Sequence, residues 1–550
     1  MQTTRIIQST PSAYNPPLLI KFILEQSTKY EPDNEILYRD IFRMNYRTLN
    51  RRIAQMAHAL TDAGIQAGDV VGVIDYDSHR YLELYFAVPM IGAVLHTINY
   101  RLPPEQIIYT VNHAEDKAVF CHEDFIPLLN GIKNKLETAE IFVLLSDRKD
   151  TSIPTPFLSE YESMIKGKPV EYDFPDFDEN SLATLFYTTG TTGKPKGVYF
   201  SHRQLVLHTI SVMTALSAID SPVRIHSSDV YMPLTPMFHV HAWGIPYVST
   251  FLGMKQIYPG KYEPEMLMQL ILTEKVTFSH CVPTILNMLV SNPKTKDLDI
   301  SHFRVIIGGS ALPAGLAKAT LGLGIDIITG YGLSETCPVL TVTYLPHRLK
   351  QKMNVDEEVA ERIKTGRAIP FVELRLIDDG GRSLPFDGKT VGELIVRAPW
   401  LTQGYFKEEE RSKDLWEGGY LHTGDMAYIE PNGTVVICDR KKDIIKSGGE
   451  WISSLDMESL LSAHQAIKEC AVIGLKDEKW GERPVALIVP NEGKIIHEED
   501  IKNHLQQFIQ SGHLSKWAVP DEFIFCKEIP KTSVGKIDKK LIRMQLAGGK

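Results

Sequence analysis

Residues 187–198 read YTTGTTGKPKGV, and a strand predicted at residues 182–189 leads into them. Three of these residues are glycines, which let the backbone turn sharply and expose its N–H groups. Four threonines and two lysines add further donors, so the segment is suited to wrap a polyphosphate. It is not a P-loop of the GxxxxGK[ST] type, because Pro195 follows Lys194 where Ser or Thr should coordinate Mg²⁺. A flexible polar surface loop is the alternative interpretation.

Two further predicted strands also run directly into glycine-rich turns. They are residues 304–307, which precede Gly308 and Gly309, and residues 325–329, which precede Gly330. In open α/β sheets, ligands bind just beyond the carboxyl ends of the strands. We therefore expect the three glycine-bearing strand ends to form one shared site.

The chain up to about residue 430 alternates helical and strand patterns, which predicts an α/β fold with mostly parallel sheets. The patterns predict an amphipathic helix at residues 47–63 and short buried strands at 69–75, 117–121 and 141–146. The most apolar run, residues 84–95, is about twelve residues long and too short to span a bilayer. We expect it to form a buried helix.

The pattern changes after Gly392, where β alternation and turn residues dominate. From Arg440 onward a smaller α+β unit is expected. Its predicted strands are residues 470–474 and 485–489, and its predicted helices are residues 455–464 and 498–509. The charged stretch DRKKD at residues 439–443 is predicted to be the linker between the two parts, although an exposed hairpin turn fits its composition equally well.

The length, charge and cysteine content of the chain limit the classes of function that it can have. At about 100–200 residues per domain, 550 residues are too many for one simple domain. Lys and Arg number 59 and Asp and Glu 68, giving a net charge of −9, which makes nucleic-acid binding a poor candidate. Placed cations and backbone amides can still hold anionic ligands. Six cysteines without CxxC spacing argue against a disulfide framework, and the N-terminal stretch lacks a signal-peptide core, so we expect a cytoplasmic protein.

The segment at 187–198 resembles the signature loop of the adenylate-forming superfamily, which includes acyl-CoA synthetases, firefly luciferases and the adenylation domains of peptide synthetases. Further motifs follow in family order. They are GGSALP (308–313), TGYGLSET (329–336), YLHTGD (420–425), DRKKDIIKSGGEWIS (439–453) and PKTSVGKIDKK (530–540). GAVLHTINYRL (92–102) extends the likeness toward the N-terminus. The stretches PMFHVHAW (236–243) and SGGEWISSLDME (447–458) most resemble those of bacterial and archaeal medium- and long-chain fatty acyl-CoA synthetases.

The resemblance implies a particular domain organisation. Residues 1–438 are expected to form a large, multi-layer domain with parallel-rich sheets and a β-rich part, which holds the ATP and acyl sites. Residues 439–443 are expected to act as a hinge. Residues 444–550 are expected to form a small, mobile α+β lid.

The nucleotide site is implied residue by residue. Glu335 lies beside hydroxyl side chains just past a predicted strand end, and carboxylate oxygens suit Mg²⁺; the resemblance implies that Glu335 and Thr188 hold that ion. Taken alone, Glu335 could instead be an acidic residue at a helix N-terminus. Asp425 is implied to accept both ribose hydroxyls, although an aspartate satisfying its own turn is an alternative. The other implied ATP or AMP contacts are Thr188, Thr189, Gly190, Thr191, Thr192, Gly193, Lys196, Gly309, Ser310, Thr329, Gly330, Tyr331, Ser334, Arg440, Lys442 and Lys536.

Lys536 is implied to stabilise the charge that develops at the α-phosphate during adenylation. Without its motif it would be read as a solvated lysine in a basic tail. Lys442 matches the residue about which the family's small domain pivots. The residues implied to face CoA after that pivot are Lys446, Gly448, Gly449 and Trp451.

On the acyl side, His239 and His241 form an HxH pair, but no third ligand stands at a spacing that suits zinc. The resemblance implies instead that His239 and Val240 line the acyl pocket, with His239 able to orient the carboxylate. Trp243 resembles an aromatic gate between the ATP site and the acyl tunnel. A plain core tryptophan is the alternative.

We therefore expect an ATP-dependent fatty acid–CoA ligase that forms acyl-AMP and then transfers the acyl group to CoA, with Mg²⁺ as cofactor. A homodimer is also implied by the resemblance. Three alternatives stay open: the same chemistry on a short, branched or aryl acid; a luciferase-type or carrier-protein-directed adenylating enzyme; and a non-catalytic nucleotide-binding protein.

Overall fold

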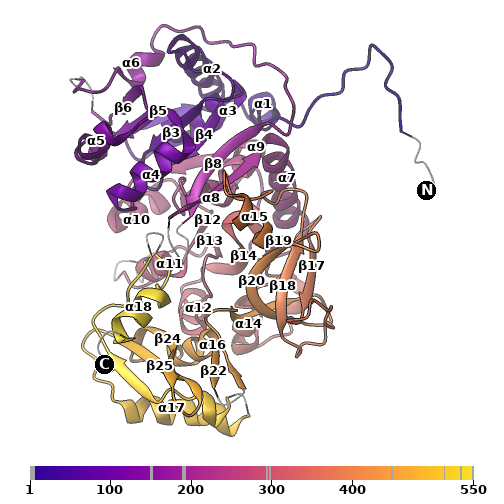
Figure 1. Cartoon of the computed structure of the whole chain (residues 1–550), viewed down its shortest axis with the longest axis vertical. Coiled ribbons are helices and arrows are strands. Elements are labelled where there is room, and N and C mark those ends of the chain that lie inside the picture. The colour runs from indigo at the N-terminus through magenta and orange to yellow at the C-terminus, as the bar shows by residue number, and fades with distance from the viewer. Residues whose placement is uncertain are drawn as a thin grey trace.

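The computed structural model describes residues 6–148, 153–188, 194–292, 295, 299–447, 450–512, 514–532 and 535–547. Over these residues the chain forms three sheets in a large N-terminal part and one sheet in a small C-terminal domain (Figure 1). This arrangement confirms the predicted α/β class with a β-rich part and a small α+β domain. No described helix has both the length and the apolar character needed to cross a bilayer.

The first sheet has seven strands. In sheet order they are β7 (Ser159–Glu160), β6 (Ile141–Leu145), β5 (Asp116–His122), β3 (Val70–Ile74), β4 (Val94–Thr97), β8 (Leu182–Thr188) and β9 (Lys196–Ser201). Neighbouring strands are parallel except for β8 and β9, which pair antiparallel with Thr188 opposite Lys196. The glycine-rich segment therefore connects the two strands of a hairpin.

The second sheet has nine strands. In sheet order they are β16 (Arg367–Ala368), β15 (Val339–Val342), β14 (Asp326–Gly332), β13 (Arg304–Ile307), β12 (Phe278–Cys281), β10 (Val230–Leu234), β11 (Lys255–Tyr258), β1 (Glu35–Tyr38) and β2 (Phe42–Asn45). The strands from β14 to β1 pair parallel, whereas β16, β15 and β2 run antiparallel to their neighbours.

The expectation that a turn begins at Gly330 is wrong. β14 continues to Gly332 because residues 330–332 pair with β15. Gly330 serves a different purpose, since a Cβ there would lie 3.1 Å from Ile306 Cγ2. Its missing side chain permits close packing against β13.

Two helices lie between these two sheets. α3 (His79–Met90) packs on β4 of one sheet and β1 of the other, and α7 (His202–Ala218) packs on β9 and β15. Every residue of α3 is buried. The single buried helix expected at residues 84–95 is wrong, because α3 ends at Met90 and Gly92, with a φ of +81°, turns the chain into β4.

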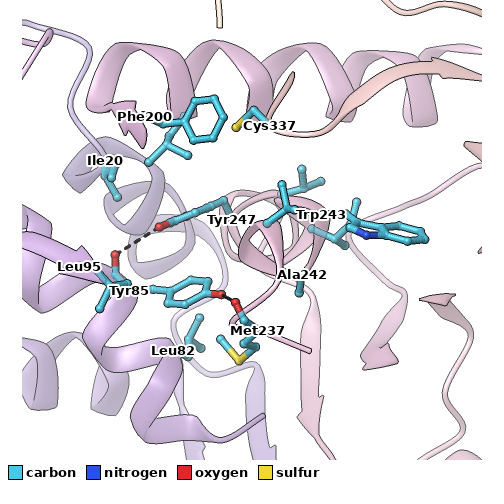
Figure 2. Close-up of a cluster of buried hydrophobic side chains, with 14 of the residues drawn as sticks. Ile20, Leu82, Tyr85, Leu95, Phe200, Met237, Ala242, Trp243, Tyr247 and Cys337 are labelled. Carbon is cyan, nitrogen blue, oxygen red and sulfur yellow. Dashed lines mark hydrogen bonds between the residues drawn. The ribbon is translucent and has the colours of Figure 1, made fainter. Parts of the chain in front are cut away.

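The core around α3 also fixes the chain that leads toward Trp243. Figure 2 shows the Tyr85 hydroxyl donating to the Met237 carbonyl, and the Tyr247 hydroxyl of α9 (Ile245–Phe251) donating to the Tyr85 carbonyl at 3.5 Å. In the same view the Trp243 ring points away from this cluster. The segment is therefore anchored at one end in the core.

The third sheet is antiparallel. Its strands are β17 (Glu373–Ile377), β18 (Gly392–Arg397), β19 (Trp416–Glu417), β20 (Tyr420–Ile429) and β21 (Val435–Arg440). The β-rich part begins with β17 at Glu373, whereas the sequence predicted that it begins after Gly392. The DRKKD stretch is divided, because its first two residues belong to β21 and residues 441–443 form a turn.

The small domain has its own sheet and its own apolar core. Its elements are β22 (Ile445–Ser447), β23 (Glu450–Ile452), β24 (Ile467–Asp477), β25 (Gly481–Pro490), β26 (Glu522–Phe525), α16 (Ser454–Ser462), α17 (Glu498–Gln510) and α18 (Lys539–Ala547). Residues such as Leu461, Val472 and Ile488 are fully buried in that core. α16 and α17 confirm both predicted helices, and β24 and β25 extend beyond the predicted strands.

Candidate active site

A cavity of about 2250 Å³ lies where the carboxyl ends of β8, β13 and β14 face the small domain. The predicted site residues that line it are Thr188, Lys196, His239, Val240, Trp243, Gly309, Ser310, Thr329, Gly330, Tyr331, Ser334, Glu335, Asp425, Arg440, Lys442 and Lys536. The predicted residues Thr189, Gly190, Thr191, Thr192, Gly193, Gly448 and Gly449 lie outside the described part of the chain. Residues from seven sequence motifs thus share one cavity.

The β8–β9 hairpin brings a hydroxyl and an ammonium group to the cavity. Thr188 ends β8, and Lys196 begins β9 directly opposite. The Lys196 ammonium lies 4.2 Å from the centre of the Tyr405 ring, a cation–π contact that holds the charge in place. A phosphate chain seated against this hairpin would meet both groups.

Glu335 follows β14 in a short 3₁₀ turn, Ser334–Thr336. Its carboxylate accepts a hydrogen bond of 2.8 Å from the Tyr405 hydroxyl and shares the cavity with Thr188. A carboxylate and a hydroxyl beside a phosphate site are the oxygen donors that Mg²⁺ prefers. The two residues therefore fit the predicted ion.

Asp425 is a buried carboxylate on β20 with two fixed partners. It accepts a hydrogen bond of 2.6 Å from the Tyr331 hydroxyl and lies 2.7 Å from Arg440 Nε. Burial raises the pKa of Asp425, while the Arg440 guanidinium acts in the opposite direction. The pair presents a preorganised acceptor at the cavity wall, as ribose hydroxyls require.

Thr329 contributes backbone rather than a free side chain. Its hydroxyl is 2.8 Å from the Thr343 hydroxyl and donates to the Lys364 carbonyl. These contacts tie β14 to neighbouring segments of the large domain. The Thr329 side chain therefore has a structural task within the large domain, although the residue also lines the cavity.

Lys536 enters the cavity from the small domain. A Cβ on Gly309 would lie 3.4 Å from Lys536 Cε, so the glycine leaves room for the lysine stem. Burial, and then the charge of Arg440, lowers the pKa of Lys536 to about 8, although Asp425 and Glu335 act to raise it. The lid thus places a cation beside the carboxylates of the large domain. Burial also lowers the pKa of Lys442 in the predicted hinge.

An unusual backbone turn presents Trp243 to the cavity. Val240, His241, Ala242, Trp243 and Gly244 all have positive φ values, between 47° and 74°. The chain before the turn is fastened by the Met237 N–H, which donates to Asp77 at 2.7 Å, and by the Thr97 hydroxyl, which donates to the Phe238 carbonyl at 3.0 Å.

The Trp243 ring rests on glycine and on a histidine ring. A Cβ on Gly308 would come within 2.9 Å of the indole, and the His280 ring centre lies 5.0 Å away. The glycine therefore does more than free the backbone, because it leaves the space that the indole fills. This places Trp243 beside the strand end that also meets Lys536.

The two histidines of the HxH pair have different surroundings. His239 lines the cavity, and burial followed by the charges of Lys536 and Arg101 lowers the pKa of His239 to about 3, so its ring is neutral at physiological pH. His241 is fully buried among aromatic rings, and neither of its ring nitrogens has a hydrogen-bond partner among the described residues. A neutral His239 can donate or accept one hydrogen bond with a carboxylate.

Comparison with known proteins agrees with this geometry. The AMP-binding enzyme family matches residues 24–406, and the AMP-binding enzyme C-terminal domain matches residues 456–536. The chain belongs to the AMP-binding enzyme family. The long-chain-fatty-acid–CoA ligase of Thermus thermophilus is 39% identical over 509 residues, covering 92% of this chain and 91% of that protein.

Other relatives of this AMP-binding enzyme are also CoA ligases. The 3-methylmercaptopropionyl-CoA ligase of Ruegeria lacuscaerulensis is 37% identical, covering 96% of this chain and 97% of that protein. The medium-chain-fatty-acid–CoA ligase of Ectopseudomonas oleovorans is 35% identical, covering 96% and 95%. The chemistry of the enzyme is accordingly that of an AMP-forming acid–CoA ligase, with a carboxylic acid, ATP and CoA as substrates.

Solved structures share the fold. The anthranilate CoA ligase AuaEII in complex with anthranoyl-AMP superposes with a TM-score of 0.84 at 23% identity, covering 96% of this chain and 98% of that one. A Mycobacterium tuberculosis fatty acyl CoA synthetase gives a TM-score of 0.71 at 26% identity, covering 97% and 99%.

Two of the residues predicted for CoA, Lys446 and Trp451, stand apart from the cavity of the AMP-binding enzyme. Lys446 and Trp451 sit opposite each other on β22 and β23, with the ammonium 5.7 Å from the indole centre. The Trp451 side chain is 49% exposed. In this arrangement of the chain the small domain directs Lys536, rather than Lys446 or Trp451, into the cavity.

Sequence reasoning missed several lining residues. The Tyr405 hydroxyl donates a hydrogen bond to Glu335, and the Lys196 ammonium lies over the Tyr405 ring. Tyr405 nevertheless belongs to none of the recognised motifs. Val212 and Leu216 line the cavity from α7, four residues apart. Their helical spacing alone is equally typical of an ordinary core face, so only the proximity of α7 to the site distinguishes them.

Proposed function

We propose that this AMP-binding enzyme activates a fatty acid. The supporting observation is an apolar wall formed by Val212 and Leu216 of α7, Ile245 of α9 and Val339 of β15, all of which line the same cavity as Trp243. A hydrocarbon chain gains about 25 cal/mol for each Å² that it buries against such a wall. A polar acid would instead lose hydrogen bonds to water there.

The first half-reaction makes a mixed anhydride. A carboxylate oxygen attacks the α-phosphorus of ATP, a new O–P bond forms, and the bond to pyrophosphate breaks. Lys536 and Arg440 supply positive charge to this region, while Asp425 holds the ribose. Fixed charges aimed at developing phosphoryl charge lower the barrier because they need no reorganisation.

Glu335 and Thr188 would hold the Mg²⁺ that this reaction is proposed to use. When bound, the ion would neutralise charge on the phosphates. Tyr405 fixes Glu335 from behind through its hydroxyl. That contact orients the carboxylate before any ligand binds.

The second half-reaction transfers the acyl group to CoA. The thiol sulfur attacks the carbonyl carbon, a C–S bond forms, and the C–O bond to AMP breaks. We propose that residues 444–550 pivot on the hinge at 439–443 relative to residues 1–438 for this step. The pivot would bring Lys446, Gly448, Gly449 and Trp451 toward the thiol side. Lys446 and Trp451, the two of these residues that the structure describes, do not line the cavity in the present arrangement.

The proposal is tested with a panel of carboxylates from acetate to octadecanoate together with benzoate. Pyrophosphate release without CoA reports the first half-reaction, and thioester formation reports the second. We expect kcat/KM to rise with chain length and then reach a plateau. An optimum at acetate or benzoate would contradict the fatty-acid proposal while leaving the acid–CoA ligase class intact. If the enzyme instead prefers a sulfur-containing acid, the optimum should lie at 3-methylmercaptopropionate, the acid in the name of a 37% identical relative.

A further inference from the structure

One helix of the small domain makes contacts with the large domain at both of its ends. α16, spanning Ser454–Ser462, lies directly beneath α12 (Ala314–Gly322) where the two parts of the molecule meet (Figure 1). Because α16 is part of the domain that carries Lys536, its position sets where that lysine can reach.

The N-terminal end of α16 is fastened to β21. The Ser454 N–H and hydroxyl donate to one carboxylate oxygen of Asp439 at 2.7 and 2.5 Å, and the Ser453 hydroxyl donates to the Cys438 carbonyl at 2.5 Å. Asp439 is only 1% exposed. A buried carboxylate at a helix N-terminus satisfies N–H groups that would otherwise lack partners.

The C-terminal end of α16 meets a glycine. A Cβ on Gly315 of α12 would lie 2.6 Å from the Ser462 carbonyl oxygen, 3.4 Å from the Ser462 carbonyl carbon and 3.8 Å from Ala463 Cα. All three of these neighbours are backbone atoms, so none can rotate out of the way as a flexible side chain would. The two helices approach this closely only because residue 315 has no side chain.

The same helix α12 is joined to the nucleotide site. It begins immediately after residues 308–313, where Gly309 accommodates the Lys536 stem. A shift of α16 away from α12 would therefore move the lid with respect to the surface that Lys536 must reach. Displacing a reacting group by about 1 Å commonly costs on the order of 100-fold in rate.

We propose that Gly315 is a positioning residue for the first half-reaction, because it lets α16 dock closely enough to seat Lys536 beside the α-phosphate. This inference rests on the proposed function. It assigns no role to Gly315 in thioester formation, for which the lid is proposed to leave this position.

The test compares two glycines of the same helix. Gly315→Ala adds a methyl group at the docking point, whereas Gly322→Ala adds one where nothing lies within 4 Å. Alanine is a better helix former than glycine, so neither change weakens α12 itself, and the strain of Gly315→Ala falls on the contact with α16. The unfolding midpoint of each variant is measured beside the rates. A purely structural role for Gly315 would not separate the two half-reactions.

We expect Gly315→Ala to slow single-turnover pyrophosphate release from ATP and dodecanoate by about 10-fold or more, given the positional sensitivity of reacting groups. Thioester formation from supplied dodecanoyl-AMP and CoA should stay within about twofold of wild type, a change too small to indicate a lost contact. Gly322→Ala should leave both rates within the same margin. A bulkier Gly315→Leu should slow the first step further.

The inference is overturned if Gly315→Ala and Gly322→Ala release pyrophosphate equally fast, or if Gly315→Ala slows both half-reactions alike. If the wild-type enzyme does not adenylate dodecanoate, the fatty-acid proposal has failed instead. The glycine comparison is then made with the acid that the carboxylate panel identifies, so the docking inference is decided separately.

Discussion

The two halves of the cavity are built from different kinds of residue. The half that we propose binds the nucleotide consists of polar groups: Thr188 and Arg440 at strand ends, Glu335 in a turn and Asp425 within β20, with Lys536 from the small domain. The half that we propose holds the acyl chain consists of the apolar wall together with Trp243 on its left-handed turn. The first half depends on fixed charges, and the second depends on shape. They should therefore respond to substitution in different kinetic parameters.

Removing the lid's cation should have the largest effect. Lys536→Ala is expected to slow acyl-AMP formation by about 100- to 1,000-fold, as losing one preorganised group that stabilises transition-state charge commonly does. Pyrophosphate release in a single turnover measures it. Lys494→Ala, at an exposed lysine of the same domain, is the control. A wild-type rate in Lys536→Ala would show that the nucleotide half does not depend on this charge.

Weakening the ribose acceptor should have the next largest effect. Asp425→Asn leaves the Tyr331 contact possible but removes the charge paired with Arg440. We expect KM for ATP to rise by about 10- to 100-fold, the usual worth of a hydrogen bond to a charged group. Preference among carboxylates should not change. Asp387→Asn, at an exposed turn, is the control and should alter neither the KM for ATP nor the preference among carboxylates. A changed chain-length preference in Asp425→Asn would contradict the division of the cavity into two halves.

Filling the acyl half should reverse this pattern. Val212→Phe adds bulk to the apolar wall, and we expect kcat/KM for long acids to fall by about 10-fold or more, in line with the discrimination that one methylene allows in an apolar pocket. KM for ATP and the rate with short acids should stay near wild type. Thr214→Phe, on the exposed side of α7, is the matched control. An equal loss for all chain lengths would place Val212 outside the acyl path.

The smallest expected effect is that of pH. Lys536 carries its charge below a pKa of about 8 and loses it above. Between about pH 7.5 and 8.5 the protonated fraction, and with it kcat/KM for adenylation in the free enzyme, should fall about threefold. Lys536→Arg stays charged throughout this range, so its slower reaction should lack this decline. A decline that persists in Lys536→Arg would assign the titration to another group.

The difference between the two halves also explains what the sequence could predict. Glu335 and Lys536 each stand in a short contiguous motif, because a charged group must occupy a fixed position beside the phosphates. The structure brings both residues to one cavity. Tyr405 supports Glu335 from a part of the chain without a recognised motif. Val212 and Leu216 have the spacing of any core-facing helix. Their position beside the cavity follows from packing between two sheets, which no local pattern records.

The sequence predicts some local backbone features correctly and misses others, because a local pattern does not record packing between distant segments. The structure contains the helix predicted at residues 455–464, which begins at Ser454, and the strand predicted at residues 304–307, which ends at Ile307. Gly330 was misjudged as a turn because a glycine that opens space and a glycine that bends the chain look alike in sequence. The turn at Val240 could not be found, since a β-branched residue gives no sign of a left-handed conformation.

That turn has a consequence for how the enzyme admits its acid. Each non-glycine residue held in the left-handed region costs roughly 1–2 kcal/mol, and four of them precede Gly244. The turn therefore stores free energy that the anchoring of Met237 and Phe238 must offset. A change of the Trp243 side-chain rotamer alone would leave that store untouched, whereas a backbone movement of residues 240–243 would release part of it. If the substrate is the proposed fatty acid, a tail that displaced Trp243 together with this backbone would have to contribute less of its own binding free energy than it would against a relaxed loop.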